Sequence, residues 1–293
     1  MTKKLQLSNE QIDSIIDLAL AEDISHGDIT SEGLIPTELQ GRASILAKAE
    51  GILAGGEISG KVFLKVAPAL KVELLIRDGD KVKPRDIVAT VSGEVIGILK
   101  AERVALNFLS RLSGIASQTA QYVAETKGLG VEIMDTRKTT PGLRLLEKYA
   151  VRTGGGQSHR SHLGDGILIK DNHITALRSL GMSLKDIVVK AKQKALEGLM
   201  VEVEVNTNRE AVEAADGGAD IIMLDNMSPD EIGRVVSLIP SQVKTEASGG
   251  ITLANVRAVA MAGVDVISIG ALTHSSKALD ISLELEPESL RLL

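Results

Sequence analysis

The sequence predicts an α/β fold: a small parallel barrel that follows a separate N-terminal domain. From Val131 onward six short runs rich in Ile and Val recur, namely VEIMDT, GILIKDN, MVEVEVN, IIMLDN, VKTEASGG and VISIGA. Helical stretches such as NREAVEAADGG, SPDEIGRVVSLI and TLANVRAVAMAG separate the later runs. Strands that alternate with helices form parallel sheets, and near-continuous apolar runs indicate burial on both faces. Six such units suggest a TIM-like barrel smaller than the usual eight-stranded one.

The segment before the barrel has a different texture. Ser8 and Gln11 predict a helix start of the capping-box type, and apolar residues then recur at helical spacing. From Gly41 to about Leu99, short aliphatic runs are cut by Gly and Pro, and we interpret ASILAKAEGILAGGE, KVELLIRDGDKV and DIVATVSGEVIGILK as strands. Asp78-Gly79 predicts a hairpin turn between two of them. Residues 101–123 return to helical spacing and lead into the barrel.

Composition excludes several classes of protein. The 293 residues suffice for one large or two ordinary domains, and a hydrophobic content of 44% is normal for a globular chain. A net charge of −6 and a pI near 5.5 argue against nucleic-acid binding through a basic face. The chain has no cysteine, so thiolate chemistry and Cys-based zinc sites are excluded. Neither the N-terminal MTKKLQLSNEQ nor any later run has the apolar length of an export signal or a membrane span, so we expect a cytoplasmic protein.

Polar residues cluster at the end of each predicted barrel strand. They are Asp135, Arg137 and Lys138 after the first run, Lys170 to His173 after the second, Glu204 and Asn206 after the third, Asp225 and Asn226 after the fourth, Ser248 to Gly250 after the fifth, and Gly270 after the sixth. In parallel α/β folds these C-terminal strand ends form the active-site face. Arginine forks and helix N-termini bind carboxylates and phosphates, so the pattern predicts a site for a small polyanion. The last two runs fit the phosphate site of such barrels.

With these motifs in place, the chain resembles the quinolinate phosphoribosyltransferases, also called nicotinate-nucleotide pyrophosphorylases (carboxylating). The resemblance rests on EDISHGDIT, ERVALNFLSRLSGIAS, DTRKTTPGLRLLEKYAVRTGGG, SHR, LIKDNH, VEVEV, MLDN, EASGGIT and VISIGALTHS, in that order. It implies an N-terminal α/β sandwich domain (residues 1–113), an incomplete TIM-like α/β barrel of the type II phosphoribosyltransferases (114–275), and a C-terminal tail (276–293) that returns to the first domain. It also implies a homodimer, or a higher homo-oligomer, with shared active sites. The implied reaction converts quinolinate and phosphoribosyl pyrophosphate into nicotinate mononucleotide, carbon dioxide and pyrophosphate, with Mg²⁺.

The resemblance also implies roles for individual residues. Arg137, His159, Arg160 and Lys170 match the quinolinate-binding positions, and Arg103 matches an arginine contributed by the neighbouring subunit. Lys138 matches a lysine near the phosphoribosyl donor, while Glu204 and Asp225 match the acids at its ribose and metal. Ser248, Gly249, Gly250 and Gly270 match the positions around the 5-phosphate. No role for His162 follows from the resemblance.

Physical chemistry is consistent with these roles. Quinolinate carries two adjacent carboxylates, so at least two cations are needed to neutralise it. Displacement of pyrophosphate from an anomeric carbon develops positive charge on the ribose, which nearby carboxylates stabilise, and Mg²⁺ assists the leaving group.

Simpler interpretations exist for several of these residues. Glu202 points to the same strand face as Glu204. For Glu202, a structural ion pair is as good an interpretation as a role in the site. Gly154 to Gly156 fit a helix C-cap better than a phosphate loop. Without the resemblance, Arg103 would be a surface arginine on an amphipathic helix.

Three other functions remain open. One is a phosphoribosyltransferase of the same fold with another acceptor, such as the paralogues associated with molybdate transport. The second is a barrel lyase that uses Lys170 to form a Schiff base. The third is a non-catalytic binding module, suggested by the segment RDGDKVKPRDIV.

Overall fold

The computed structural model describes residues 8–292, which form two compact units. The first unit contains residues 8–120, 140–155 and 275–292, and the second contains residues 121–139 and 156–274. Residues 1–7, which carry part of the segment in which the sequence analysis expects no export signal, and residue 293 lie outside the described part. Among the described residues, no helix is both long enough and apolar enough to cross a membrane.

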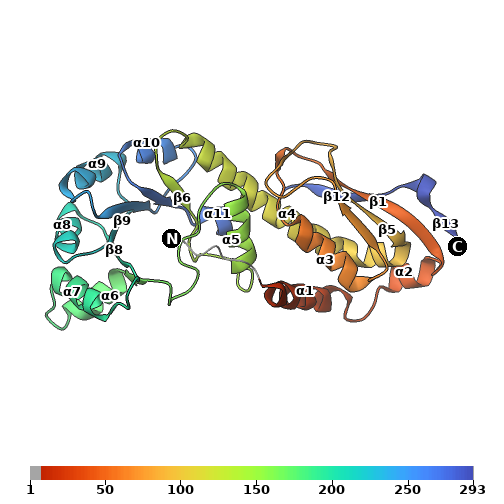
Figure 1. The fold of residues 1–293 in the computed structure, drawn as a ribbon, viewed down its shortest axis with the longest axis horizontal. Helices are drawn as coiled ribbons and strands as arrows, with labels where there is room; N and C mark the ends of the chain where they lie inside the picture. The colour runs from red at the N-terminus through yellow and green to blue at the C-terminus, as the bar shows by residue number, and fades with distance from the viewer. Residues whose placement is uncertain (1–7, 293) are drawn as a thin grey trace. The chain divides into compact units, whose positions relative to one another are not determined.

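The first unit is built on an antiparallel sheet with the strand order β12-β1-β5-β3 (Figure 1). Its strands are β1 (Leu39–Ala47), β3 (Lys71–Leu74), β5 (Ile87–Glu94) and β12 (Ile281–Leu285), and β13 (Arg291–Leu292) also pairs with β1. The short strands β2 (Gly51–Ile52) and β4 (Lys81–Val82) pair with each other. The C-terminal segment of the chain therefore completes a sheet that begins near residue 39.

Helices α1 (Asn9–Ile24), α2 (Ile29–Leu34) and α3 (Gly56–Val66) belong to this unit. The predicted start of α1 is confirmed, because the Ser8 side chain accepts a hydrogen bond from the Gln11 N–H at 3.2 Å. The buried face of α3 includes Val62 and Phe63, and it packs against β3.

Part of the strand prediction for this region is wrong. The sequence analysis did not predict α3, and it extended the last strand through VIGILK, which instead begins the 31-residue helix α4 (Val95–Glu125). Asp78-Gly79 is not a hairpin turn, because β3 pairs with β5 and not with β4. The Asp78 carboxylate instead accepts hydrogen bonds from the Gly55 N–H at 2.7 Å and the Gly56 N–H at 2.9 Å, where α3 begins. Asp-Gly is common to several turn types, and here the carboxylate stabilises a helix N-terminus.

The second unit contains the predicted six-stranded parallel sheet. Its strands are β6 (Glu132–Met134), β7 (Ile167–Ile169), β8 (Val201–Val205), β9 (Ile221–Asp225), β10 (Lys244–Ser248) and β11 (Val266–Ser268). They are ordered β6-β11-β10-β9-β8-β7, and every neighbouring pair is parallel. The strands β6 and β7 form the two edges, so the sheet is an incomplete barrel as predicted.

Along the chain, helices alternate with the barrel strands. They are α6 (Asp171–Arg178), α7 (Leu184–Lys194), α8 (Asn208–Asp216), α9 (Pro229–Leu238), α10 (Val256–Met261) and α11 (Ala271–His274). In Figure 1 the barrel strands lie inside an arc that includes the helices α8, α9 and α10. Local sequence explains where they start: the Ser228 side chain accepts a hydrogen bond from the Glu231 N–H, Glu231 bonds back to Ser228, and Pro229 occupies the first turn.

The remaining helix, α5 (Arg144–Thr153), follows the segment TTPG and belongs to the first unit, and a single 3-10 turn, η1, spans Pro287–Ser289. Gly154 ends α5, with its N–H donating to the Ala150 carbonyl oxygen, so the predicted C-cap is confirmed. An added Cβ at Gly154 would lie 2.3 Å from the backbone oxygen of Ala116 on α4. The glycine is required because the two helices approach each other closely at this point.

Candidate active site

The C-terminal ends of the barrel strands carry charged side chains, as the sequence predicts. Lys170 follows β7, Glu204 lies near the end of β8, and the Lys170 ammonium forms an ion pair with the Glu204 carboxylate. Asp225 ends the neighbouring strand β9, and its carboxylate accepts a hydrogen bond from the Asn226 side-chain amide at 2.7 Å. The Glu204 side chain is 12% exposed, so its carboxylate is largely shielded from solvent, whereas the Lys170 side chain is 42% exposed.

A second group of cations follows β6. The Nε atom of Arg137 is buried, and within residues 8–292 it has no hydrogen-bond partner. Lys138 is exposed, and its backbone oxygen accepts a hydrogen bond from the Thr273 hydroxyl at 2.7 Å. The Lys138 side chain passes close to Gly270, where an added Cβ would lie 3.1 Å from Lys138 Cδ and from His274 Nε2. The structure therefore places Lys138 and Gly270 together, with His274 beside them.

The loop at residues 159–166 has no regular secondary structure, yet side chains fix its backbone. Four consecutive backbone N–H groups donate hydrogen bonds to side-chain atoms. His159 donates to Asp135 Oδ1 at 2.9 Å, Arg160 to His159 Nδ1 at 2.9 Å, and Ser161 and His162 to Asp165 Oδ2 at 2.7 and 3.1 Å. His162, which had no assigned role, is exposed and its Nε2 lies 2.9 Å from Asp165 Oδ1. This loop carries Arg160, whose guanidinium donates to the Gly166 carbonyl at 3.5 Å.

Two glutamates hold the His159 ring from inside the barrel. His159 Nε2 lies 3.2 Å from Glu202 Oε2 on β8 and 3.4 Å from Glu246 Oε2 on β10. The side chains of Glu202 and Glu246 are 7% and 2% exposed. A structural role for Glu202 was one of its two predicted interpretations, and the structure supports that one. The sequence analysis missed Glu246. It lies inside a strand between two buried residues in KTEAS, as Glu202 does in VEVEV.

The electrostatics of this group favour a shared proton. Burial alone would lower the pKa of His159, and hydrogen bonds with Glu202 and Glu246 raise it, but the Arg160 N–H that points at Nδ1 keeps a second proton off that nitrogen. The Arg160 N–H bond to Nδ1 requires that nitrogen to carry no proton, so we place the imidazole proton on Nε2, facing the two carboxylates. Burial, followed by repulsion from Glu246, raises the pKa of Glu202 despite the hydrogen bond from His159.

The cations also influence one another. Burial, and next the charge of Arg137, lower the pKa of Arg160, while Glu202 acts in the opposite direction. Arg137 and Arg160 are therefore close enough to repel each other. An anion bound between them would relieve this repulsion.

The backbone of the loop after β10 lies close to the end of the neighbouring strand β9. Gly249 and Gly250 have φ angles of +81° and +63°. An added Cβ at Gly249 would lie 2.4 Å from Asn226 Oδ1 and 2.8 Å from Asp225 Oδ1, so only glycine fits. The Ser248 hydroxyl accepts a hydrogen bond from the Ser268 hydroxyl at 3.1 Å. The predicted residues Ser248 to Gly250 thus lie beside Asp225 at the barrel mouth.

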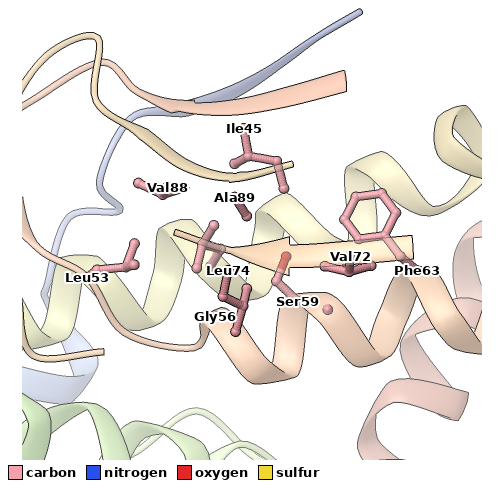
Figure 2. Close-up of a pocket in the computed structure, with 11 residues that line it drawn as sticks. Ile45, Leu53, Gly56, Ser59, Phe63, Val72, Leu74, Val88 and Ala89 are labelled. Atoms are coloured by element: carbon pink, nitrogen blue, oxygen red, sulfur yellow. The ribbon is translucent and has the colours of Figure 1, made fainter. Parts of the chain in front are cut away.

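Arg103 lies on α4 in the first unit, where it is exposed and its Nη2 is 3.8 Å from Glu102 Oε1. This is the surface position that the sequence alone favours. A small cavity in the same unit lies between α3 and the sheet (Figure 2). Its lining is apolar apart from Ser59, so it belongs to the hydrophobic core and offers no group for catalysis.

Comparisons with known proteins identify the family. Residues 28–113 match the family model described as quinolinate phosphoribosyl transferase, N-terminal domain, and residues 115–284 match its C-terminal domain. The chain is 44% identical over 279 residues to a probable nicotinate-nucleotide pyrophosphorylase [carboxylating] of Bacillus subtilis, covering 95% of each protein. It is 45% identical over 291 residues to the chloroplastic nicotinate-nucleotide pyrophosphorylase [carboxylating] of Arabidopsis thaliana, covering 94% of this chain and 83% of that protein.

A solved structure gives the same result. NadC from Streptococcus pyogenes superimposes with a TM-score of 0.90 at 41% identity, covering 99% of this chain and all of that one. The chain belongs to the quinolinate phosphoribosyltransferase family.

Proposed function

We propose that this protein transfers the phosphoribosyl group from phosphoribosyl pyrophosphate to quinolinate, with decarboxylation, to give nicotinate mononucleotide, carbon dioxide and pyrophosphate in NAD biosynthesis. The buried Arg137 Nε supports this proposal most directly, since it is a donor without an acceptor among the described residues and lies near a second arginine, Arg160. Such a donor is costly to leave unpaired, and a carboxylate of the acceptor would satisfy it. Lys170 supplies a third cation at the same strand ends.

We assign Glu204 and Asp225 to the phosphoribosyl donor and its metal. Both are carboxylates at the ends of adjacent strands, and hard oxygen ligands of this kind suit Mg²⁺. When bound, Mg²⁺ would stabilise the negative charge on the leaving pyrophosphate. The two carboxylates would repel quinolinate, so their place is at the ribose and not at the acceptor. Lys138 lies beside Gly270 and reaches the donor from the other side of the mouth, while Ser248, Gly249 and Gly250 receive the 5-phosphate.

We further propose a cytoplasmic homodimer whose sites are shared between subunits. The exposed guanidinium of Arg103 would then bind a quinolinate carboxylate in the partner's site, where its planar fork fits that group.

One assay tests the proposal. The protein is incubated with phosphoribosyl pyrophosphate and Mg²⁺ and with either quinolinate or nicotinate, and nicotinate mononucleotide and carbon dioxide are measured. We expect turnover with quinolinate only, because a single carboxylate leaves buried positive charge unpaired. Glu204→Gln should weaken the use of phosphoribosyl pyrophosphate while leaving binary quinolinate binding intact. Equal turnover of nicotinate, or loss of quinolinate binding in Glu204→Gln, would contradict these assignments.

A phosphoribosyltransferase with another acceptor is the second candidate. The same assay decides between them, since an enzyme of that kind would bind phosphoribosyl pyrophosphate and release no carbon dioxide from quinolinate.

A further inference from the structure

The barrel interior contains two carboxylates where branched apolar residues are usual. Glu202 lies two residues before Glu204 on the same face of β8, so it occupies the layer below the barrel mouth. Glu246 reaches the same place from β10, and its side chain is 2% exposed. Two buried carboxylates so close to each other are costly, so an arrangement that keeps both has to gain something from them.

Their common partner is His159, which reaches into the barrel from the loop between α5 and β7. Its Nε2 contacts both carboxylates, at 3.2 and 3.4 Å. Its Nδ1 accepts the Arg160 backbone N–H at 2.9 Å. Both ring nitrogens are therefore engaged within the chain.

A continuous series of contacts thus runs from the barrel core to Arg160. The two carboxylates fix the ring, the ring fixes the Arg160 backbone, and Asp135 Oδ1 fixes the His159 backbone at 2.9 Å. Glu202 also attracts the Arg160 guanidinium and offsets its repulsion by Arg137. Because the loop has no helix or strand of its own, these side chains, together with the Gly166 carbonyl that accepts from the guanidinium, hold Arg160 in one place.

We propose that Glu202 and Glu246 are positioning residues for the acceptor, which act by holding His159 and, through it, Arg160. The inference rests on the proposed function, because it takes Arg160 to bind a carboxylate of quinolinate. On this view His159 orients the acceptor site. Side chains that orient a ligand-binding group from behind are the usual way to keep such a site preorganised.

Glu246 gives the cleaner test, since Glu202 lies beside the proposed donor ligand Glu204. In Glu246→Leu the ring loses one of its two acceptors, whereas Glu246→Gln keeps an oxygen at the same distance. Calorimetry should show quinolinate binding about 10- to 100-fold weaker in Glu246→Leu, the usual cost of losing an outer partner of a ligand-binding group. In Glu246→Gln it should stay within about fivefold of the parent, since only the charge of one hydrogen bond is lost. Phosphoribosyl pyrophosphate binding should not change in either variant.

Thr245→Val is the matched control. Thr245 is the buried neighbour of Glu246 on β10, and its hydroxyl donates to Asp265 Oδ2 at 3.1 Å and not to His159. It should lower the melting temperature slightly and leave quinolinate binding unchanged. Steady-state kinetics should agree, with the KM for quinolinate rising in Glu246→Leu and the KM for phosphoribosyl pyrophosphate constant.

A second measurement does not depend on how the variants fold. In ¹⁵N-histidine NMR of the parent protein, His159 should show one protonated and one unprotonated ring nitrogen, with the unprotonated one assigned to Nδ1. Two protonated nitrogens would overturn the inference, because Nδ1 could then not accept the Arg160 N–H. Parent-like quinolinate binding in folded Glu246→Leu, or an equal loss of donor binding, would also overturn it. A parent protein that binds no quinolinate would refute both this inference and the proposed function.

Discussion

Asp78 is expected to hold the first unit together at a place where the sequence suggests only a turn. Its Oδ2 accepts hydrogen bonds from the Gly55 N–H at 2.7 Å and from the Tyr149 hydroxyl, and its Oδ1 accepts from the Gly56 N–H at 2.9 Å. One carboxylate therefore joins the start of α3 to α5. Asp78→Ala removes three acceptor contacts at once.

The cost follows from those contacts. Hydrogen bonds to a charged group contribute about 1.5–3 kcal/mol each, and removal of a helix cap alone costs about 1 kcal/mol. Because the site is only partly buried and water replaces some of the bonds, we expect a loss of about 3 kcal/mol in the free energy of unfolding. For a chain of this size that corresponds to a fall of roughly 6–12 °C in Tm. Tyr149→Phe removes one of the three bonds and should cost about 1 kcal/mol.

Denaturant unfolding of a double-mutant cycle measures these values. Tyr149→Phe should cost little more once Asp78 is already Ala, which gives a coupling energy of about 1 kcal/mol. Asp80→Ala is the control, since Asp80 is exposed in the same loop and accepts a long bond of 3.4 Å from the Arg77 N–H. It should change stability by less than about 0.5 kcal/mol. Equal effects of Asp78→Ala and Asp80→Ala would refute the reasoning.

The same cluster predicts a pH effect. Burial, and next the hydrogen bond to Asp78, raise the pKa of Tyr149. A group whose pKa is raised in the folded state stabilises the protein below its ordinary pKa and loses that contribution as the pH rises above it. Stability should therefore decline above pH ~10, the ordinary pKa of tyrosine. Tyr149→Phe should show a smaller decline.

Two further predictions concern helix packing and subunit sharing. Gly154→Ala should destabilise the protein by about 1–3 kcal/mol, because its Cβ would lie 2.3 Å from the Ala116 oxygen. Gly60 lies inside α3 and beside the cavity of Figure 2. Gly60→Ala should stabilise the protein by about 0.5–1 kcal/mol, since its Cβ would meet no atom nearer than 3.5 Å. Thermal unfolding of the two variants shows whether Gly154→Ala lowers and Gly60→Ala raises the stability. An equal mixture of inactive Arg103→Ala and Lys138→Ala subunits should regain roughly a quarter of the parent activity, because half the dimers are mixed and each carries one intact site. If mass spectrometry confirms subunit exchange and no activity returns, Arg103 does not act in a partner's site.

The barrel was predictable because burial on both faces leaves a mark in the sequence. A strand such as IIMLD is apolar almost throughout, and its first polar residue, Asp225, coincides with the strand end. The sequence therefore located both the sheet and the edge that carries the charges. The N-terminal unit was harder, since its pairing is not between neighbours in sequence: β3 pairs with β5, and residues near the C-terminus pair with β1. Local turn signals such as Asp78-Gly79 do not contain that information.

Glu202 and Glu204 show what sequence periodicity leaves undetermined about a site. They lie on one face of one strand, so alternation assigns them the same side of the sheet and says nothing about depth. In the structure, Glu202 and Glu204 have different partners because they lie two residues apart along β8. Glu204 lies at the mouth and pairs with Lys170 from the next strand, while Glu202 lies one layer lower, where the ring of His159 enters from an irregular loop. The contact that gives Glu202 its role depends on a loop without periodicity and on a second strand more than 40 residues away, so it emerges only when the chain is folded.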